Sequence, residues 1–165
     1  MKKLLFTLLA SSWLLIAPSA HAEHSIGFAA GSTKGVGATY RYLPDPGSES
    51  SWGWQATGLP FVTTDGGTVS LGGALLYRLH QGKEAMAYAS LGVGVLAMWD
   101  NCGDSDSFCE SESHWGAGIG PGIGFELRML DNVGWSVEIP LALMFADNEF
   151  YGLYPVPNTA LVYYW

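Results

Sequence analysis

The chain has 165 residues, of which 48% are hydrophobic, 13% aromatic and only 13% charged. Acidic residues outnumber basic residues by fifteen to seven, which gives a formal net charge of −8. This balance excludes nucleic-acid binding, which needs basic side chains to neutralise phosphates. The low charged fraction is also unlike that of a soluble β-sandwich.

Residues 1–22 have the features of a secretory signal peptide. Two lysines near the start precede a largely apolar run at 4–16, and Ala-His-Ala at 20–22 provides a small-x-small cleavage site. Cleavage would remove two basic residues and no acidic one, so the mature charge is −10. No other run of about 20 apolar residues exists, so we expect no transmembrane helix. The sequence predicts one domain over residues 23–165.

An apolar periodicity of two predicts eight strands after the signal. In chain order, the predicted strands cover residues 24–30, 36–43, 52–62, 68–80, 85–99, 114–130, 133–145 and 156–165. The expected connections are short at 31–35, 44–50, 63–67, 81–84 and 131–132, and long at 100–113 and 146–155.

The two strands on either side of Asp131 and Asn132 have the clearest pattern. Alternate positions from 115 to 129 are apolar, and the positions between them hold five glycines, Glu126 and Arg128. A long strand with one apolar face and one small or polar face is typical of a membrane β-barrel. Aromatic residues near the predicted strand ends fit interfacial girdles. We therefore predict an all-β fold, an eight-stranded antiparallel up-and-down transmembrane β-barrel.

Residues 161–165, Leu-Val-Tyr-Tyr-Trp, end the chain on alternating apolar residues and an aromatic residue. Together with the signal and the strand count, this ending makes the chain resemble small outer-membrane barrels of the OmpA transmembrane-domain and OmpX-like type. The resemblance implies a monomer in the outer membrane of a Gram-negative cell, in contact with lipid and lipopolysaccharide. It also implies that the barrel assembly machinery binds Trp165, where phenylalanine is usual. The connections at 31–35, 63–67, 100–113 and 146–155 would then face outside.

Inward positions in the half near the short turns are polar. They are Arg41, Gln55, Arg78, Glu126, Arg128 and Glu138. Eight strands leave a lumen only wide enough for side chains or one slender ligand, and charges buried there must pair. We expect a salt-bridged plug that makes the barrel rigid; a proton or ion path is the alternative.

Inward positions in the outer half are apolar and lie beside several glycines. They are Leu59, Phe61, Leu96, Met98, Ala142 and Met144. Either large and small residues fill this space, or an apolar pocket there holds one acyl chain.

Pro121 and Pro140 face each other on neighbouring strands, where each removes a ladder hydrogen bond. They predict a lateral seam, similar to those of the lipid A palmitoyltransferase barrel, or alternatively two bulges that relieve packing.

His114, near serines and carboxylates, is the one weak catalytic candidate. Cys102 and Cys109, in an exported chain, predict a disulfide within an acidic loop. That loop does not match an EF-hand, so we expect a solvated loop rather than cation binding, and neither a metal site nor a cofactor.

The sequence favours a structural or acyl-chain-binding barrel. The alternative is an acyltransferase or deacylase acting on lipid A or phospholipid, and a host-facing adhesin is a third option.

Overall fold

The computed structural model describes residues 22–44, 51–64, 66–100 and 113–165, and its regular structure is entirely β-strand. In chain order the strands are β1 (Ala22–Gly31), β2 (Gly35–Pro44), β3 (Trp52–Val62), β4 (Gly66–Gln81), β5 (Ala85–Asp100), β6 (Ser113–Leu130), β7 (Val133–Ala146), β8 (Glu149–Pro155) and β9 (Asn158–Tyr164). No helix within these ranges is long and apolar enough to span a membrane. The predicted signal cleavage site and the predicted disulfide between Cys102 and Cys109 lie outside the described residues.

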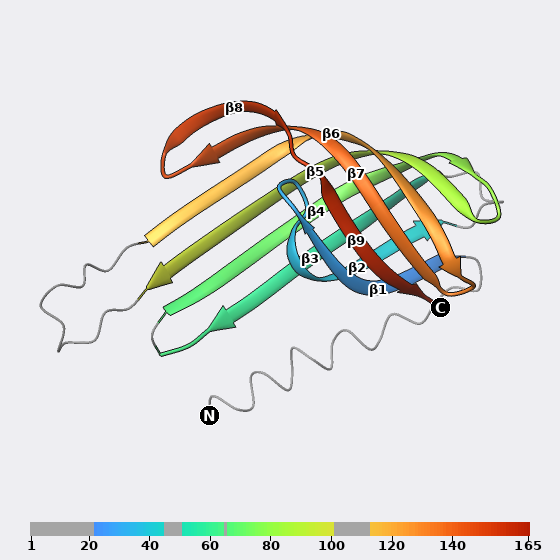
Figure 1. Cartoon of the computed structure of the whole chain (residues 1–165), viewed down its shortest axis with the longest axis horizontal. Helices are drawn as coiled ribbons and strands as arrows, with labels where there is room; N and C mark the ends of the chain where they lie inside the picture. The colour runs from blue at the N-terminus through green and yellow to red at the C-terminus, as the bar shows by residue number, and fades with distance from the viewer. Residues whose placement is uncertain (1–21, 45–50, 65, 101–112) are drawn as a thin grey trace, which may run out of the picture.

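The strands form a closed antiparallel barrel (Figure 1). Each strand from β1 to β6 pairs with the next one along the chain. Strand β9 pairs with both β7 and β1, which closes the ring. Strands β8 and β9 share the eighth position, because β8 pairs with the second half of β7 and β9 with the first half. The predicted eight-stranded antiparallel fold is confirmed, with its last strand divided in two.

The barrel has two ends with different connections. We define the loop end as the end where β1, β3, β5 and β7 finish, on the left in Figure 1. The turn end, on the right, is where β2, β4 and β6 finish and where the C-terminal residue lies. Strands β3 to β6 extend further toward the loop end than the β1–β2 turn does, so the wall is not equally tall all round.

The prediction of a long loop at residues 146–155 is wrong. Strand β7 runs to Ala146, a two-residue turn follows at Asp147 and Asn148, and β8 begins at Glu149. The two turn residues have φ of 48° and 69°. Positive φ at both central residues defines the type I′ turn, which suits the twist of a β-hairpin. Asp and Asn tolerate this left-handed conformation, so the sequence did contain a turn signal.

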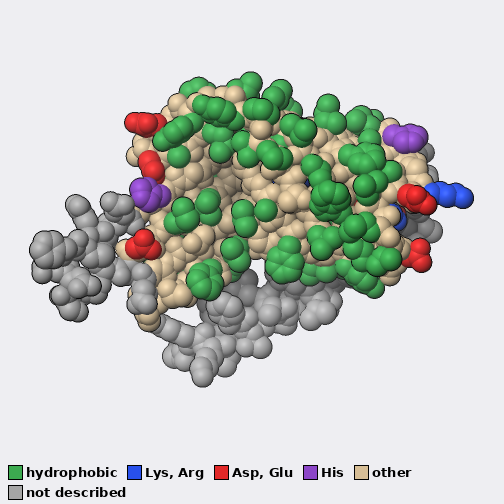
Figure 2. Space-filling view, viewed as in Figure 1, with side chains coloured by type: hydrophobic (Ala, Val, Ile, Leu, Met, Phe, Trp, Pro, Cys, Tyr) green, Lys and Arg blue, Asp and Glu red, His purple; other side chains and the backbone are tan. Residues whose placement is uncertain are grey.

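The outer surface of the barrel is apolar in the middle and charged at the ends. Large outward side chains such as Phe28, Leu71, Ile123 and Ile139 are more than half exposed. In Figure 2 the charged side chains gather at the two ends, and the band between them shows hydrophobic side chains and backbone. A soluble monomer rarely exposes so continuous an apolar surface, whereas a barrel surrounded by lipid requires one.

The tip of the β1–β2 hairpin folds into the lumen. Thr33 and Lys34 are 0% and 3% exposed, and Figure 1 shows this turn among the strands rather than beyond them. A Cβ at Gly72 of β4 would lie 2.1 Å from the Lys34 carbonyl oxygen, and one at Gly92 of β5 would lie 2.5 Å from that of Thr33. The connection was expected to face outside; it turns inward because these glycines leave room for its backbone. We call residues 31–35 the inturned hairpin.

Candidate functional site

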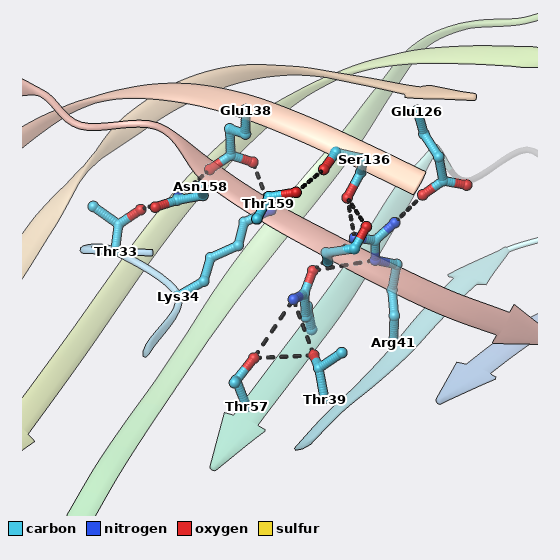
Figure 3. A network of polar contacts seen from close by, with 12 residues as sticks. Thr33, Lys34, Thr39, Arg41, Thr57, Glu126, Ser136, Glu138, Asn158 and Thr159 are labelled. Atoms are coloured by element: carbon cyan, nitrogen blue, oxygen red, sulfur yellow. Dashed lines mark hydrogen bonds and ion pairs between the residues drawn. The ribbon is translucent and has the colours of Figure 1, made fainter. Parts of the chain in front are cut away.

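The lumen holds a network of buried polar side chains (Figure 3). Its first part surrounds Arg41 of β2, whose guanidinium pairs with Glu126 of β6. Arg41 also donates to Gln55 Oε1 from Nε at 3.1 Å and from Nη2 at 3.0 Å, and to Ser136 Oγ at 3.2 Å. The Tyr164 hydroxyl donates to the second carboxylate oxygen of Glu126 at 2.5 Å. These five residues come from five strands, so the network joins walls of the barrel that are not neighbours.

The second part of the network surrounds Lys34 of the inturned hairpin. Lys34 Nζ lies 2.6 Å from Glu138 Oε2 and 5.1 Å from the centre of the Tyr88 ring. Asn158 Nδ2 donates to Glu138 Oε1 at 2.9 Å and to Thr33 Oγ1 at 2.8 Å. These contacts tie the tip of the hairpin to β7 and to β9, the strand that pairs with β1.

The buried charges of the network balance. The ion pairs Arg41–Glu126 and Lys34–Glu138 contain two cations and two carboxylates, and each side chain is at most 3% exposed. A buried charge is very costly without a partner, and a pair offsets this cost only when further hydrogen bonds satisfy both groups. We call the two ion pairs and the side chains described above that hydrogen-bond to them the polar plug; its members are Thr33, Lys34, Arg41, Gln55, Glu126, Ser136, Glu138, Asn158 and Tyr164.

Four of the six residues proposed for the plug from the sequence lie together in it: Arg41, Gln55, Glu126 and Glu138. The other two lie at the turn end. Arg78 donates to the Pro44 carbonyl oxygen. Arg128 pairs with Glu23, and the side chains of this pair are each about one quarter exposed. Lys34 was missed because the short connection that carries it was expected to face solvent.

Apolar side chains fill the lumen between the polar plug and the turn end. Leu43, Leu76, Met86 and Val162 are at most 4% exposed and form one cluster with the Tyr88 ring. Among the described residues, the turn-end half of the barrel is therefore packed with side chains, as expected for eight strands.

On the loop-end side of the inturned hairpin lies a cavity of about 320 Å³ with a mostly apolar lining. We call it the loop-end cavity. Its lining includes Gly31, Ser32, Gly35, Val36, Gly94, Leu96, Gly116, Met144 and Val156. The inturned hairpin thus separates this cavity from the polar plug.

Leu96 and Met144, two of the six residues proposed for an apolar pocket, line the loop-end cavity. The other four are outside its lining: Leu59, Phe61, Met98 and Ala142. Ala142 is completely buried, whereas Phe61 and Met98 are exposed toward the loop end. Several inward glycines that were expected to leave empty volume instead contact the backbone of the inturned hairpin.

The β6–β7 ladder is interrupted beside the two prolines. Its pairs reach Ile119 with Leu143 and resume at Gly122 with Pro140, in an unchanged register. Pro121 is exposed on the outside and Pro140 is buried. An apolar groove of about 480 Å³ lies along the outside of this seam. The prolines therefore coincide with missing ladder pairs and not with a bulge.

His114 is paired with the β7–β8 turn. Its Nδ1 lies 3.0 Å from Asp147 Oδ2, and the other carboxylate oxygen accepts the Trp115 backbone N–H at 3.0 Å. His114 and Asp147 side chains are 56% and 45% exposed. The Trp115 N–H, followed by the His114 side chain, lowers the pKa of Asp147.

The pKa of Asp147 in the folded protein is below its ordinary value. The ionised carboxylate therefore stabilises the turn fully at a pH above the ordinary pKa. The contribution is lost as the pH falls through the lowered pKa. We expect the Trp115 amide resonance to shift with a midpoint below pH 3.8. Asp147→Asn, which tolerates the same left-handed backbone, should abolish the titration. A midpoint at or above 3.8 would contradict this assignment.

The sequence matches no family model, and no curated protein is similar to it in sequence. Solved structures do resemble the fold. The N-terminal β-barrel domain of Pseudomonas aeruginosa OprF is 13% identical, with 87% of this chain and 96% of that chain covered and a TM-score of 0.48. Ail, the attachment invasion locus protein of Yersinia pestis, is 17% identical, with 90% and 100% covered and a TM-score of 0.46. Neisserial surface protein A is 14% identical, with 87% and 92% covered and a TM-score of 0.36. This likeness concerns the fold alone.

Proposed function

We propose that the protein is an integral outer-membrane barrel whose loop-end cavity binds a single acyl chain. The apolar outer belt and the closed ring of strands support insertion in a bilayer. The observation that carries acyl-chain binding is an apolar cavity whose floor is the inturned hairpin. Its volume is at the low end of the range for ligand pockets, about 300–1,000 Å³, which favours one narrow ligand.

The same proposal gives the protein an orientation. The turn end lies in the periplasm and the loop end faces outside, because bacterial barrels have short periplasmic turns and longer outer loops. Trp165 stacks on His24 with ring centres 6.2 Å apart at the turn end, and it is the residue that the assembly machinery binds. The loop-end cavity then lies at the level of the outer leaflet and its lipopolysaccharide.

Filling the cavity is the direct test of acyl-chain binding. Met144 lines it, and Leu143, the preceding residue on β7, faces outward with 41% of its surface exposed. Met144→Trp should weaken palmitate binding by about tenfold or more, since the apolar burial that drives binding is lost. The matched Leu143→Trp should bind as the unmodified protein does. Palmitate retained on protein released from nanodiscs, measured by native mass spectrometry, gives the comparison.

The same experiment addresses the second candidate function, a lipid-modifying enzyme, which the His114–Asp147 pair at the loop end favours. A bound chain recovered unaltered from nanodiscs that contain lipid A supports the binding function. Lipid A or phospholipid with a changed acyl mass supports the enzyme. Equal palmitate retention by both tryptophan variants would overturn acyl-chain binding in this cavity.

A further inference from the structure

The seam between β2 and β3 is open in its loop-end half. The ladder between the two strands ends where Ala38 pairs with Gly58. Strand β3 continues to Val62, and in the described ranges these last residues pair with β4 alone. The edge of β3 that faces β2 therefore has no strand beside it at this height.

The cause is the inward path of β2. Gly37 has a φ of 133°, and a Cβ there would lie 2.3 Å from the Gly58 carbonyl oxygen, so a side chain would block the bend. Beyond it, the Val36 N–H donates to Ser70 Oγ of β4 at 2.8 Å. Strand β2 thus passes behind the end of β3 to reach β4. Pro60 lies on the part of β3 that does not pair with β2. This position fits the preference of proline for strands with a free edge.

A groove of about 510 Å³ lies on the outside of the barrel at this seam. We call it the seam groove; its outward-facing residues include Ile26, Ala38, Ala56, Gly58, Pro60 and Leu71. None of the residues that line it is charged. The groove is hollow because small residues replace the large side chains found elsewhere in the apolar belt.

The seam groove and the loop-end cavity lie on opposite sides of the same two short segments. Gly35 and Val36 of β2 line the cavity, and Ala38 lines the groove. On β4, Ser70 lines the cavity and Leu71 the groove. The groove and the cavity are therefore about one strand layer apart, and a chain that entered between β2 and the free end of β3 would reach the cavity by displacing the Val36–Ser70 hydrogen bond.

We propose that the seam groove holds an acyl chain of the surrounding membrane lipid and is the route by which that chain enters the loop-end cavity. The inference rests on the proposed function, since it names the entrance to the same cavity. The occupant is lipid because the groove is continuous with the apolar belt, whose exposed residues Ile26 and Leu71 form its edges. This places the entrance at the β2–β3 seam and not at the proline seam between β6 and β7.

A phospholipid with a photoreactive diazirine at the end of its palmitoyl chain maps the route. The protein is reconstituted with it in phosphatidylethanolamine and phosphatidylglycerol liposomes, irradiated at successive times and digested for mass spectrometry. We expect adducts at Ala38 and Leu71 to exceed those at Ile123 of the proline seam, and adducts at Leu96 and Met144 to appear later. Cavity adducts with no excess at the seam groove would overturn the route and leave the proposed function standing.

Gly58→Phe blocks the groove without a clash, because a Cβ at Gly58 would lie 3.5 Å from the nearest atom, on the Leu71 side chain. Cavity labelling should become about tenfold slower, since changes in access affect rates over one to three decades. Ala89→Phe, at a half-buried outward position on β5, is the matched control and should label at the original rate. An unchanged rate in Gly58→Phe refutes the route. Groove adducts without cavity adducts at any time refute both the route and acyl-chain binding.

Discussion

Replacing Arg41 by Met should lower the free energy of unfolding by about 3–5 kcal/mol, the usual cost of removing one partner of a buried ion pair. Arg41 is completely buried and connects Glu126, Gln55 and Ser136. Its removal leaves the buried Glu126 carboxylate without its guanidinium partner, while the Tyr164 hydroxyl still donates to it. Urea titration in lipid vesicles, followed by tryptophan fluorescence and by heat-dependent gel migration, measures the effect.

Arg128 supplies the matched control for this change. It also pairs with a glutamate, Glu23, but both side chains are about one quarter exposed at the turn end. Arg128→Met should cost about 1 kcal/mol, clearly less than Arg41→Met, because water at the turn end still hydrates the partly exposed Glu23 carboxylate. The double variant Arg41→Met with Glu126→Leu should recover most of the loss, since an apolar pair of similar size is often no less stable. Equal costs for the two arginine variants would show that burial of the Arg41 pair is not what stabilises the barrel.

The placement of the plug residues was accessible from the sequence because strand periodicity is a strict rule. Once the alternation on either side of the Asp131 turn is recognised, parity alone sends Glu126 and Glu138 inward, and the same rule sends Arg41 and Gln55 inward on β2 and β3. The alternation does not tell how far along the barrel axis an inward side chain lies, or how deeply it is buried. Arg128 follows the same alternation as Glu126, yet it lies far enough toward the turn end to reach solvent and Glu23.

Lys34 could not be placed by periodicity, because it belongs to a connection and not to a strand. The relevant signal lies in other strands, where Gly72, Gly92 and Gly118 form an inward surface with no side chains. In the sequence such glycines look like empty volume. In the barrel the backbone of the inturned hairpin packs against them. A Cβ at Gly118, for example, would lie 2.6 Å from the Ser32 carbonyl oxygen. A set of inward glycines on adjacent strands thus indicates close backbone approach as readily as a pocket.

The inturned hairpin connects the two parts of the lumen. One side of it supplies Lys34 and Thr33 to the polar plug, and the other side supplies Gly31, Ser32 and Gly35 to the wall of the loop-end cavity. Stability of the plug and shape of the cavity are therefore coupled through five residues. The bend at Gly37 that directs β2 inward is also what leaves β3 without a neighbour at the β2–β3 seam.

Gly92→Val should expel the inturned hairpin from the lumen. The added Cβ would lie 2.5 Å from the Thr33 carbonyl oxygen, and a backbone atom cannot rotate away as a side chain can. Expulsion also separates Lys34 from Glu138. The free energy of unfolding should fall by about 3 kcal/mol or more, from overpacking and from loss of the buried pair.

The reactivity of Lys34 distinguishes expulsion from a general loss of stability. In nanodiscs, where the reagent reaches both ends of the barrel, a water-soluble amine reagent should leave Lys34 unmodified in the parent protein, where it is 3% exposed, and should modify it in Gly92→Val. Exposed Lys83 in the β4–β5 turn is the internal standard. Gly116→Val is the matched control, because a Cβ there would lie 3.7 Å from its nearest neighbour, and it should keep Lys34 protected. Protection of Lys34 in Gly92→Val would mean that the glycine surface does not hold the hairpin, since the β5 backbone would then have accommodated the valine.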